Sequence, residues 1–215
     1  MFASMRRYRL ERGTMDELAR RIDEDFAGQL AEQPGFVAYE FINCGFGEFM
    51  TMSIFLTLEQ AEASRELARR WADENRDLEF PRIEAAHGEI LVGRAAEGML
   101  EASHVDAGRK SAAISRYRLH EGSVAELMRK ADGVFADRFE AMEGFEAWHV
   151  FDCGGDEILW ISFVRNYAAA EASDERAGRF VYEDLREFRL ERKVALRGNL
   201  IVSRARTELL EPAHA

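Results

Sequence analysis

Two side chains able to move protons stand at matching places in two similar stretches of the chain. Glu40 in the first stretch corresponds to His149 in the second, and each lies in the middle of an apolar segment. A histidine in a partly buried pocket can act as a general base near neutral pH and take a proton from an acidic phenol or enol. The alternative is a hydrogen-bonded structural histidine. The pattern therefore gives His149 as a candidate catalytic base and Glu40 as a candidate substrate contact.

Arginines alternate with other residues near the start of each similar stretch, around Arg7 to Arg9 and Arg116 to Arg118. Arg9 and Arg118 share strand parity with Arg7 and Arg116 respectively, so one face of each segment carries cations. A guanidinium group suits an anionic oxygen because its fork donates several hydrogen bonds without losing charge. Arg9 and Arg118 are therefore candidate oxyanion-stabilising residues. The alternative is that they form structural ion pairs with glutamates.

Large aromatic residues accompany these charged groups. Tyr39, Trp71, Trp148 and Trp160 are able to stack on a planar ligand, and equally able to fill a core. They are candidate substrate-binding residues. The histidines have no metal-ligand spacing, and no phosphate-binding loop follows a strand, so neither a metal nor a cofactor is expected. Cys44 and Cys153 occupy matching positions, either as two small buried thiols or as a disulfide.

Composition narrows the class of partner. The formal net charge of −11 argues against nucleic acid and anionic membranes, which would require a basic face. No apolar run approaches the length of a membrane span, and the first residues lack a secretory apolar stretch. We expect a cytoplasmic protein whose partner is a small aromatic or apolar molecule.

The chain is a tandem duplication with a period of about 109 residues. Its clearest matches are Arg7-Tyr8-Arg9-Leu10 with Arg116-Tyr117-Arg118-Leu119, Cys44-Gly45 with Cys153-Gly154, and Ala61-Glu62-Ala63-Ser64 with Ala170-Glu171-Ala172-Ser173. One residue is added late in the second copy, which aligns Gly88 with Gly198. We expect a first repeat over residues 1–95, a linker over 96–112, a second repeat over 113–206 and a C-terminal tail over 207–215.

Each repeat is predicted to run strand, helix, strand, strand, helix, strand. The expected strands are 7–11, 36–43, 48–55 and 89–94 in the first repeat, and 145–152, 157–164 and 199–204 among those of the second. Capping-box patterns at Thr14 and Ser123 open the first helices, and Thr57 and Asn166 are expected to cap the second ones. The first helix places Leu18, Ile22 and Phe26 on one apolar stripe.

A βαββαβ order predicts an α+β fold of two ferredoxin-like repeats, each an antiparallel sheet with both helices on one face. The strands carry aromatic residues on both faces, so the second face also needs cover. Stacking the two sheets in one chain would give an intramolecular structure like a dimeric α+β barrel. Further homodimerisation is compatible with this arrangement.

These features resemble the antibiotic biosynthesis monooxygenase (ABM) domain family of the dimeric α+β barrel superfamily. The resemblance rests on Pro34-Gly35-Phe36-Val37-Ala38-Tyr39-Glu40, on Ser53-Ile54-Phe55, on Ala61-Glu62-Ala63-Ser64 and on Trp71. It implies a cofactor-independent monooxygenase acting on a small aromatic or enolisable molecule, or an isomerase. Trp71 resembles the family's helix tryptophan, whereas the second repeat has Phe180 there. The alternatives are a protein that binds a small ligand without turnover and a stress-associated protein whose cavity is filled by side chains.

Overall fold

A computed structural model describes residues 1–105 and 110–215, which form two compact units. Among the described residues, unit 1 comprises 1–87, 99–105 and 198–209, and unit 2 comprises 88–98, 110–197 and 210–215. Each unit therefore contains most of one sequence repeat and a short piece from the end of the other. The repeat boundaries given above remain predictions about the duplicated sequence.

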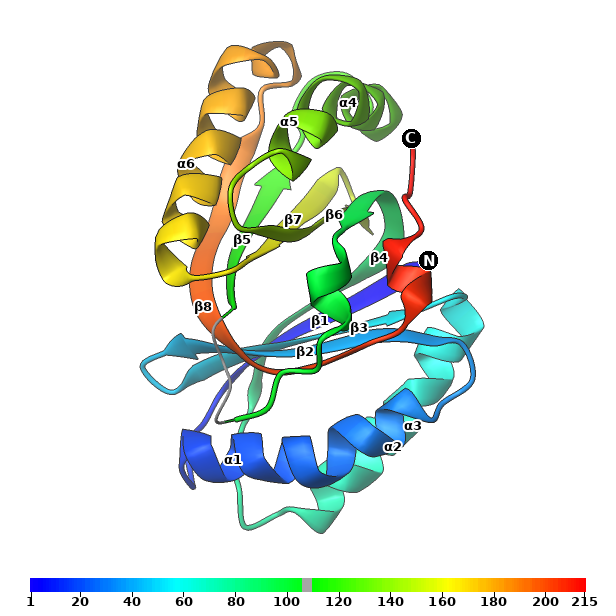
Figure 1. The fold of residues 1–215 in the computed structure, drawn as a ribbon, viewed down its shortest axis with the longest axis vertical. Helices are drawn as coiled ribbons and strands as arrows, with labels where there is room; N and C mark the ends of the chain where they lie inside the picture. The colour runs from blue at the N-terminus through cyan, green and yellow to red at the C-terminus, as the bar shows by residue number, and fades with distance from the viewer. Residues whose placement is uncertain (106–109) are drawn as a thin grey trace. The chain divides into compact units, whose positions relative to one another are not determined.

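The elements of the first half follow the predicted order (Figure 1). They are β1 (Phe2–Arg9), α1 (Met15–Arg21), the π-helical turn η1 (Ile22–Phe26), α2 (Ala27–Ala31), β2 (Phe36–Gly45), β3 (Glu48–Phe55), α3 (Leu58–Glu74), β4 (Arg82–Ala95) and the 3-10 turn η2 (Glu97–Leu100).

The second half repeats the same order. Its elements are β5 (Ser111–Arg118), α4 (Val124–Lys130), the π-helical turn η3 (Ala131–Ala136), α5 (Asp137–Glu140), β6 (Phe145–Gly154), β7 (Glu157–Val164), α6 (Tyr167–Glu183), η4 (Arg186–Phe188), β8 (Glu191–Ala205) and η5 (Thr207–Leu210).

Each unit has an antiparallel sheet with helices packed on it. In unit 1, β3 pairs with β1 and β2, and β2 pairs with the C-terminal half of β8. In unit 2, β7 pairs with β5 and β6, and β6 pairs with the C-terminal half of β4. Helices α2 and α3 pack on the first sheet, and α5 and α6 on the second. The predicted α+β class with two ferredoxin-like repeats is confirmed.

The first long helix of each repeat contains a widened turn. Leu18, Ile22, Phe26 and Leu30 are all buried although they follow one another at four-residue intervals. At about 100° per residue, that spacing would rotate the last of them roughly 120° away from the first. The π-helical turn Ile22–Phe26 adds room for an extra residue and keeps the stripe on the sheet. The turn Ala131–Ala136 does the same for the second repeat.

The predicted caps are present with one difference. Thr57 and Ser123 form reciprocal capping boxes, and Asn166 caps its helix through the backbone N–H of Ala169. Thr14 accepts the backbone N–H of Glu17 at 3.2 Å, which is half of a box. The other half is missing because the Glu17 carboxylate accepts from Arg21 instead.

The last strand of each repeat is longer than predicted. β4 begins at Arg82 and β8 at Glu191, before the apolar segments that suggested strands. A glycine marks the point where each strand passes from one unit to the other, Gly88 in β4 and Gly198 in β8. A Cβ at Gly88 would lie 1.5 Å from the Asp152 carbonyl oxygen, and one at Gly198 would lie 2.5 Å from that of Asn43. Only glycine allows these close approaches without a backbone shift.

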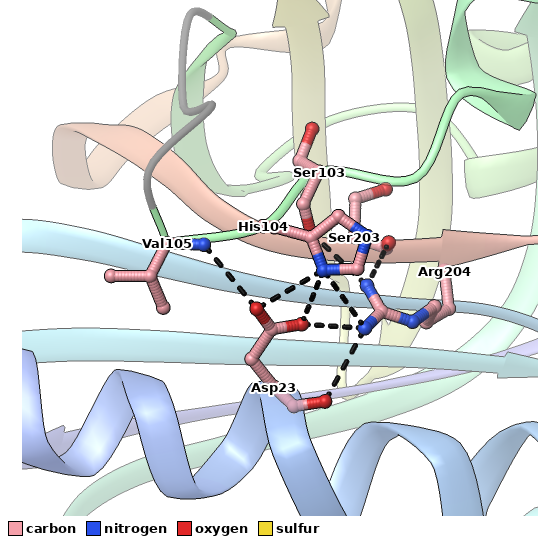
Figure 2. A network of polar contacts seen from close by, with 6 residues as sticks. All are labelled: Asp23, Ser103, His104, Val105, Ser203 and Arg204. Atoms are coloured by element: carbon pink, nitrogen blue, oxygen red, sulfur yellow. Dashed lines mark hydrogen bonds and ion pairs between the residues drawn. The ribbon is translucent and has the colours of Figure 1, made fainter.

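A polar network fastens the segment after η2 to unit 1 (Figure 2). His104 Nδ1 lies 2.9 Å from Asp23 Oδ1, Arg204 donates to both Asp23 and the Ser103 carbonyl, and the backbone of Ser103 pairs with Ser203. Burial raises the pKa of Asp23, but the hydrogen bonds from Arg204 and His104 outweigh it and lower the pKa below its ordinary value.

Unit 2 repeats this network with the C-terminal residues. Arg94 and His214 both contact Asp132, and Ala213 pairs with Gly93. The segments 97–105 and 207–215 are therefore equivalent, each a 3-10 turn followed by a short paired stretch. Treating them as an irregular linker and a tail misses this match, because its only conspicuous residues are Leu-Glu and a histidine in each copy.

Two remaining expectations concern the cysteines and membranes. Neither Cys44 nor Cys153 forms a disulfide, and burial raises the pKa of the Cys44 thiol to about 11. Within residues 1–105 and 110–215, no helix is long and apolar enough to cross a membrane.

Candidate functional site

Unit 1 contains a cavity of about 450 Å³ between its sheet and its helices. Six of its lining side chains are aromatic: Tyr8, Phe26, Tyr39, Phe49, Trp71 and Phe80. A volume of this size with a mostly apolar wall is typical of sites for small organic molecules. The cavity is therefore the candidate functional site.

Strand and helix periodicity bring these residues together. Arg6 and Tyr8 alternate on β1, and Thr51 on β3 is paired with Arg6 across the ladder, so their side chains share one face of the sheet. On α3, Ser64 and Trp71 lie seven residues apart, about two turns, so they share a face, and Arg65 follows Ser64 at its edge; all three line the cavity. These two strands and this helix supply part of the wall, and Tyr39 on β2 and Arg82 on β4 add further polar groups.

The aromatic side chains hold one another in place. Tyr8 stacks on Phe49 with ring centroids 5.0 Å apart, and Phe26 contacts both Tyr39 at 5.5 Å and Trp71 at 5.3 Å. Trp71 Nε1 donates to Asp25 Oδ2 at 2.9 Å, which fixes the indole plane. A planar ligand would meet preformed ring faces and edges rather than mobile side chains.

One buried polar group in the cavity wall has no protein partner. The Tyr39 side chain is buried, and its hydroxyl has no hydrogen-bond partner among the residues that the structure describes. Burial raises the pKa of this hydroxyl above its ordinary value, so it stays protonated and able to donate. A buried hydroxyl without a partner costs free energy, and a polar atom on a ligand would remove that cost.

The equivalent place in unit 2 is almost completely filled. Only about 10 Å³ remains between Phe139, Trp148 and Trp160. Trp160 replaces Thr51, Trp148 replaces Tyr39 and Phe139 replaces Leu30. The two tryptophans meet edge to face at 5.7 Å, and Phe135 stacks on Phe180 at 4.2 Å. The same scaffold therefore has an open pocket in unit 1 and a packed core in unit 2.

The structure brings two of the predicted site residues together. Tyr39 and Trp71 both line the unit 1 cavity. Trp148 and Trp160 belong to unit 2, where they pack against other aromatic rings. Their contact with a ligand stays a prediction.

Glu40 and His149 are fully buried in their own units. Each follows directly after a residue that faces the helices, Tyr39 or Trp148, so it points to the opposite face of its sheet. Neither is among the lining residues of the unit 1 cavity. The catalytic role of His149 stays a prediction, and the hydrogen bond proposed as its structural alternative is missing, since neither ring nitrogen has such a partner within the described residues.

Arg9 and Arg118 lie outside the unit 1 cavity, and each is paired with a glutamate in the same way. Arg9 forms a salt bridge with Glu48 at 2.5 Å, and Arg118 forms one with Glu157. Arg7 and Arg116 join these pairs from the same strands. These arrangements match the structural alternative, and the predicted oxyanion role has no support from the geometry of the cavity.

Burial of His149 has a consequence for stability. Burial lowers its pKa from 6.5 to about 4, so between those values the unfolded chain binds the proton that the folded chain excludes. The folded protein therefore has its full stability above pH 6.5 and loses part of it as the pH falls toward 4. The loss of unfolding free energy is about 3 kcal/mol, since a difference of one in pKa corresponds to about 1.4 kcal/mol. We expect the difference in unfolding free energy between the wild type and His149→Gln, measured in urea at pH 7 and pH 4, to shift by that amount in favour of the variant. A constant difference at both pH values would contradict a neutral buried imidazole.

The residues that distinguish the two units can be aligned in the sequence, but their side-chain types alone do not mark them as site residues. Thr51 against Trp160, and Arg65 against Asp174, align at the same spacing of about 109 residues as the rest of the repeat. Their importance depends on which face of the strand or helix meets the cavity. The signal in the sequence is a change of side-chain volume or charge between the two repeats, at positions whose side chains lie on the same face as Tyr39 and Arg6.

No family model and no curated protein matches the sequence. Solved structures match its fold over nearly the whole length. A candidate monooxygenase from Fusobacterium nucleatum subsp. nucleatum has a TM-score of 0.65 at 5% identity, covering 99% of this chain and 94% of its own. A second from Lactobacillus acidophilus has a TM-score of 0.68 at 7% identity, with 95% of each chain covered. An anthrone oxidase-like protein has a TM-score of 0.60 at 12% identity, with 97% and 94% covered.

At these identities the likeness concerns the fold. The expected resemblance is confirmed at that level, since proteins described as candidate monooxygenases and as anthrone oxidase-like share this fold. Fold alone does not establish a reaction. The chain has the tandem ferredoxin-like α+β fold of these monooxygenase-type proteins.

Proposed function

We propose that the unit 1 cavity binds a small planar aromatic or enolisable molecule and presents it to molecular oxygen, as a cofactor-independent monooxygenase. The observation that carries this proposal is the contrast between an open cavity of about 450 Å³ in unit 1 and about 10 Å³ at the equivalent place in unit 2. Large aromatic side chains can close this site, as unit 2 demonstrates. Unit 1 has the smaller residues Thr51 and Leu30 at the equivalent positions, which leaves a space lined by the remaining aromatic rings.

The wall of the cavity suits such a molecule. Trp71, Tyr8 and Phe49 offer apolar faces for a flat ring system, and the Tyr39 hydroxyl offers one hydrogen bond. Oxidation of an activated methylene by O2 places one oxygen atom in the new carbonyl. The other oxygen leaves as water with the two methylene hydrogens, and the substrate supplies all the electrons. Exclusion of water by the rings would protect the substrate carbanion or enolate during this step.

A second candidate is ligand binding without turnover. Among the lining residues in the part of the chain that the structure describes, there is no carboxylate and no imidazole to serve as a general base. In this case the same cavity would hold an aromatic molecule and release it unchanged. A binding protein of this kind would not need the catalytic base predicted at His149.

Two measurements on the purified protein separate these candidates. Quenching of intrinsic tryptophan fluorescence by anthrone and by naphthol reports binding, with Trp71→Phe showing which part of the signal arises in unit 1. An oxygen electrode, with mass spectrometry of the product formed under labelled O2, reports turnover. Saturable quenching with oxygen uptake supports the monooxygenase, and quenching without uptake supports the binding protein. No saturable binding of any planar aromatic would contradict both.

A further inference from the structure

Four arginines line the unit 1 cavity. Arg69 is exposed and forms an ion pair with Glu66 at 2.7 Å, and the other three come from three different elements. Arg6 lies on β1, Arg65 on α3 and Arg82 at the start of β4. We propose that the ligand of this cavity is an organic anion, an aromatic carboxylate or an acidic phenol or enol, whose negative oxygen binds between Arg6, Arg65 and Arg82. This inference rests on the proposed function and names the chemical class of its ligand.

The positive charge of this cluster is poorly balanced by the protein. Arg65 has Glu62 at 3.7 Å, whereas neither Arg6 nor Arg82 forms an ion pair within residues 1–105 and 110–215. Arg6 is half-buried, and its desolvation together with the charges of Arg65 and Arg82 lowers its pKa, while Tyr8 opposes the shift. A guanidinium group still keeps its proton under these conditions. Three mutually repelling cations therefore meet at the edge of an apolar cavity.

In unit 2 the equivalent positions carry much less unpaired positive charge. Ser115 replaces Arg6, Asp174 replaces Arg65, and Arg192 corresponds to Arg82. Arg192 donates to Ser115 Oγ at 2.8 Å and forms an ion pair with Asp174. Two cations have been removed, the third has gained a carboxylate, and the pocket beside them is filled. The charge and the cavity therefore disappear together.

An anion bound in unit 1 would supply the carboxylate that unit 2 carries as Asp174. A guanidinium fork donates paired hydrogen bonds to a planar carboxylate, and such charged hydrogen bonds are about twice as strong as neutral ones. The Tyr39 hydroxyl, buried and without a hydrogen-bond partner in the described residues, provides a second polar contact in the same cavity. Arginines close to a phenol or enol would also lower its pKa and favour the reactive anion without a protein base.

The test uses two fluorescent probes with the same aromatic skeleton, anilinonaphthalene sulfonate, which is anionic, and phenylnaphthylamine, which is neutral. Arg65→Asp copies the residue of unit 2 and is expected to pair with Arg82. We expect it to weaken sulfonate binding about tenfold or more, and to leave binding of the neutral probe within about twofold. Arg70→Asp makes the same charge change at an exposed position of α3 outside the cavity and should alter neither probe by more than about twofold.

Circular dichroism confirms folding of each variant, and Arg82→Gln gives a second reading if Arg65→Asp does not fold. Equal affinities of wild type for the two probes, unchanged in Arg65→Asp and Arg82→Gln, would overturn the anion inference while leaving the cavity as a ligand site. Equal losses of sulfonate affinity in Arg65→Asp and Arg70→Asp would also overturn the inference, because the weaker binding would then follow from the change in net charge of the protein. Failure of both probes to bind the wild type would contradict the proposed function together with this inference.

Discussion

Replacing Thr51 by Trp is expected to abolish binding of planar aromatic molecules in unit 1, with a loss of affinity of about 100-fold or more. Thr51 lines the cavity, and Trp160 at the equivalent position in unit 2 is part of the packing that leaves about 10 Å³. The new indole would occupy the space needed by the ligand. The measurement is a fluorescence titration with anilinonaphthalene sulfonate, followed by oxygen uptake with any substrate identified.

The control for this variant is Thr51→Val, which keeps nearly the same volume and replaces the hydroxyl by a methyl group. It should bind the probe within about threefold of the wild type, because the apolar wall of the cavity is unchanged. Thermal unfolding should show that Thr51→Trp lowers the free energy of unfolding by at most about 3 kcal/mol, because overpacking a pocket that cannot fully expand costs about that much. Undiminished probe binding by a folded Thr51→Trp would place the ligand elsewhere in the molecule.

The reverse replacement, Trp160→Thr, is expected to destabilise the protein by about 3–5 kcal/mol. Trp160 contacts the rings of Tyr117, Phe135, Trp148 and Phe180, and it is 3% exposed. Its removal takes away this packing and leaves a cavity that the neighbouring rings only partly fill. Urea unfolding followed by circular dichroism measures the loss.

A matched control is Tyr182→Thr, which removes an aromatic ring from α6 in the same unit. The Tyr182 side chain is 82% exposed, so its loss should change the unfolding free energy by no more than about 0.5 kcal/mol. If Trp160→Thr cost less than about 1 kcal/mol, Trp160 would not be filling a closed core. The contrast between the two units would then have another origin.

The fold was largely predictable because it is encoded in local patterns that occur twice. Helix caps at Thr57, Ser123 and Asn166 and the glycines around the hairpins depend on neighbouring residues only, and the structure confirms them. The N-terminal halves of β4 and β8 were missed because charged residues there resemble a solvated segment. Pairing with a neighbouring strand, which is not a local property, makes them strands.

The site was less predictable, and strand parity is the reason. Glu40 against His149 was the sharpest chemical difference between the repeats, yet both residues point away from the helices. The sequence pattern likewise indicated Arg9, whereas Arg6, on the opposite face of β1, lines the cavity. Aromatic residues occur on both faces of β2, so the sequence does not reveal which face encloses a cavity. Cavity volume depends on how side chains from several elements fit together, and Thr51 acquires its meaning only in that context.

The most direct test is a crystal structure of the protein grown with a bromonaphthoate, using anomalous scattering from bromine to locate the ligand. We expect an anomalous peak inside unit 1 beside Trp71 and Tyr39, with the carboxylate directed at Arg6, Arg65 and Arg82 and no peak at Trp148 and Trp160 in unit 2. A peak confined to unit 2, or an empty unit 1 cavity at a ligand concentration that saturates binding in solution, would contradict the account.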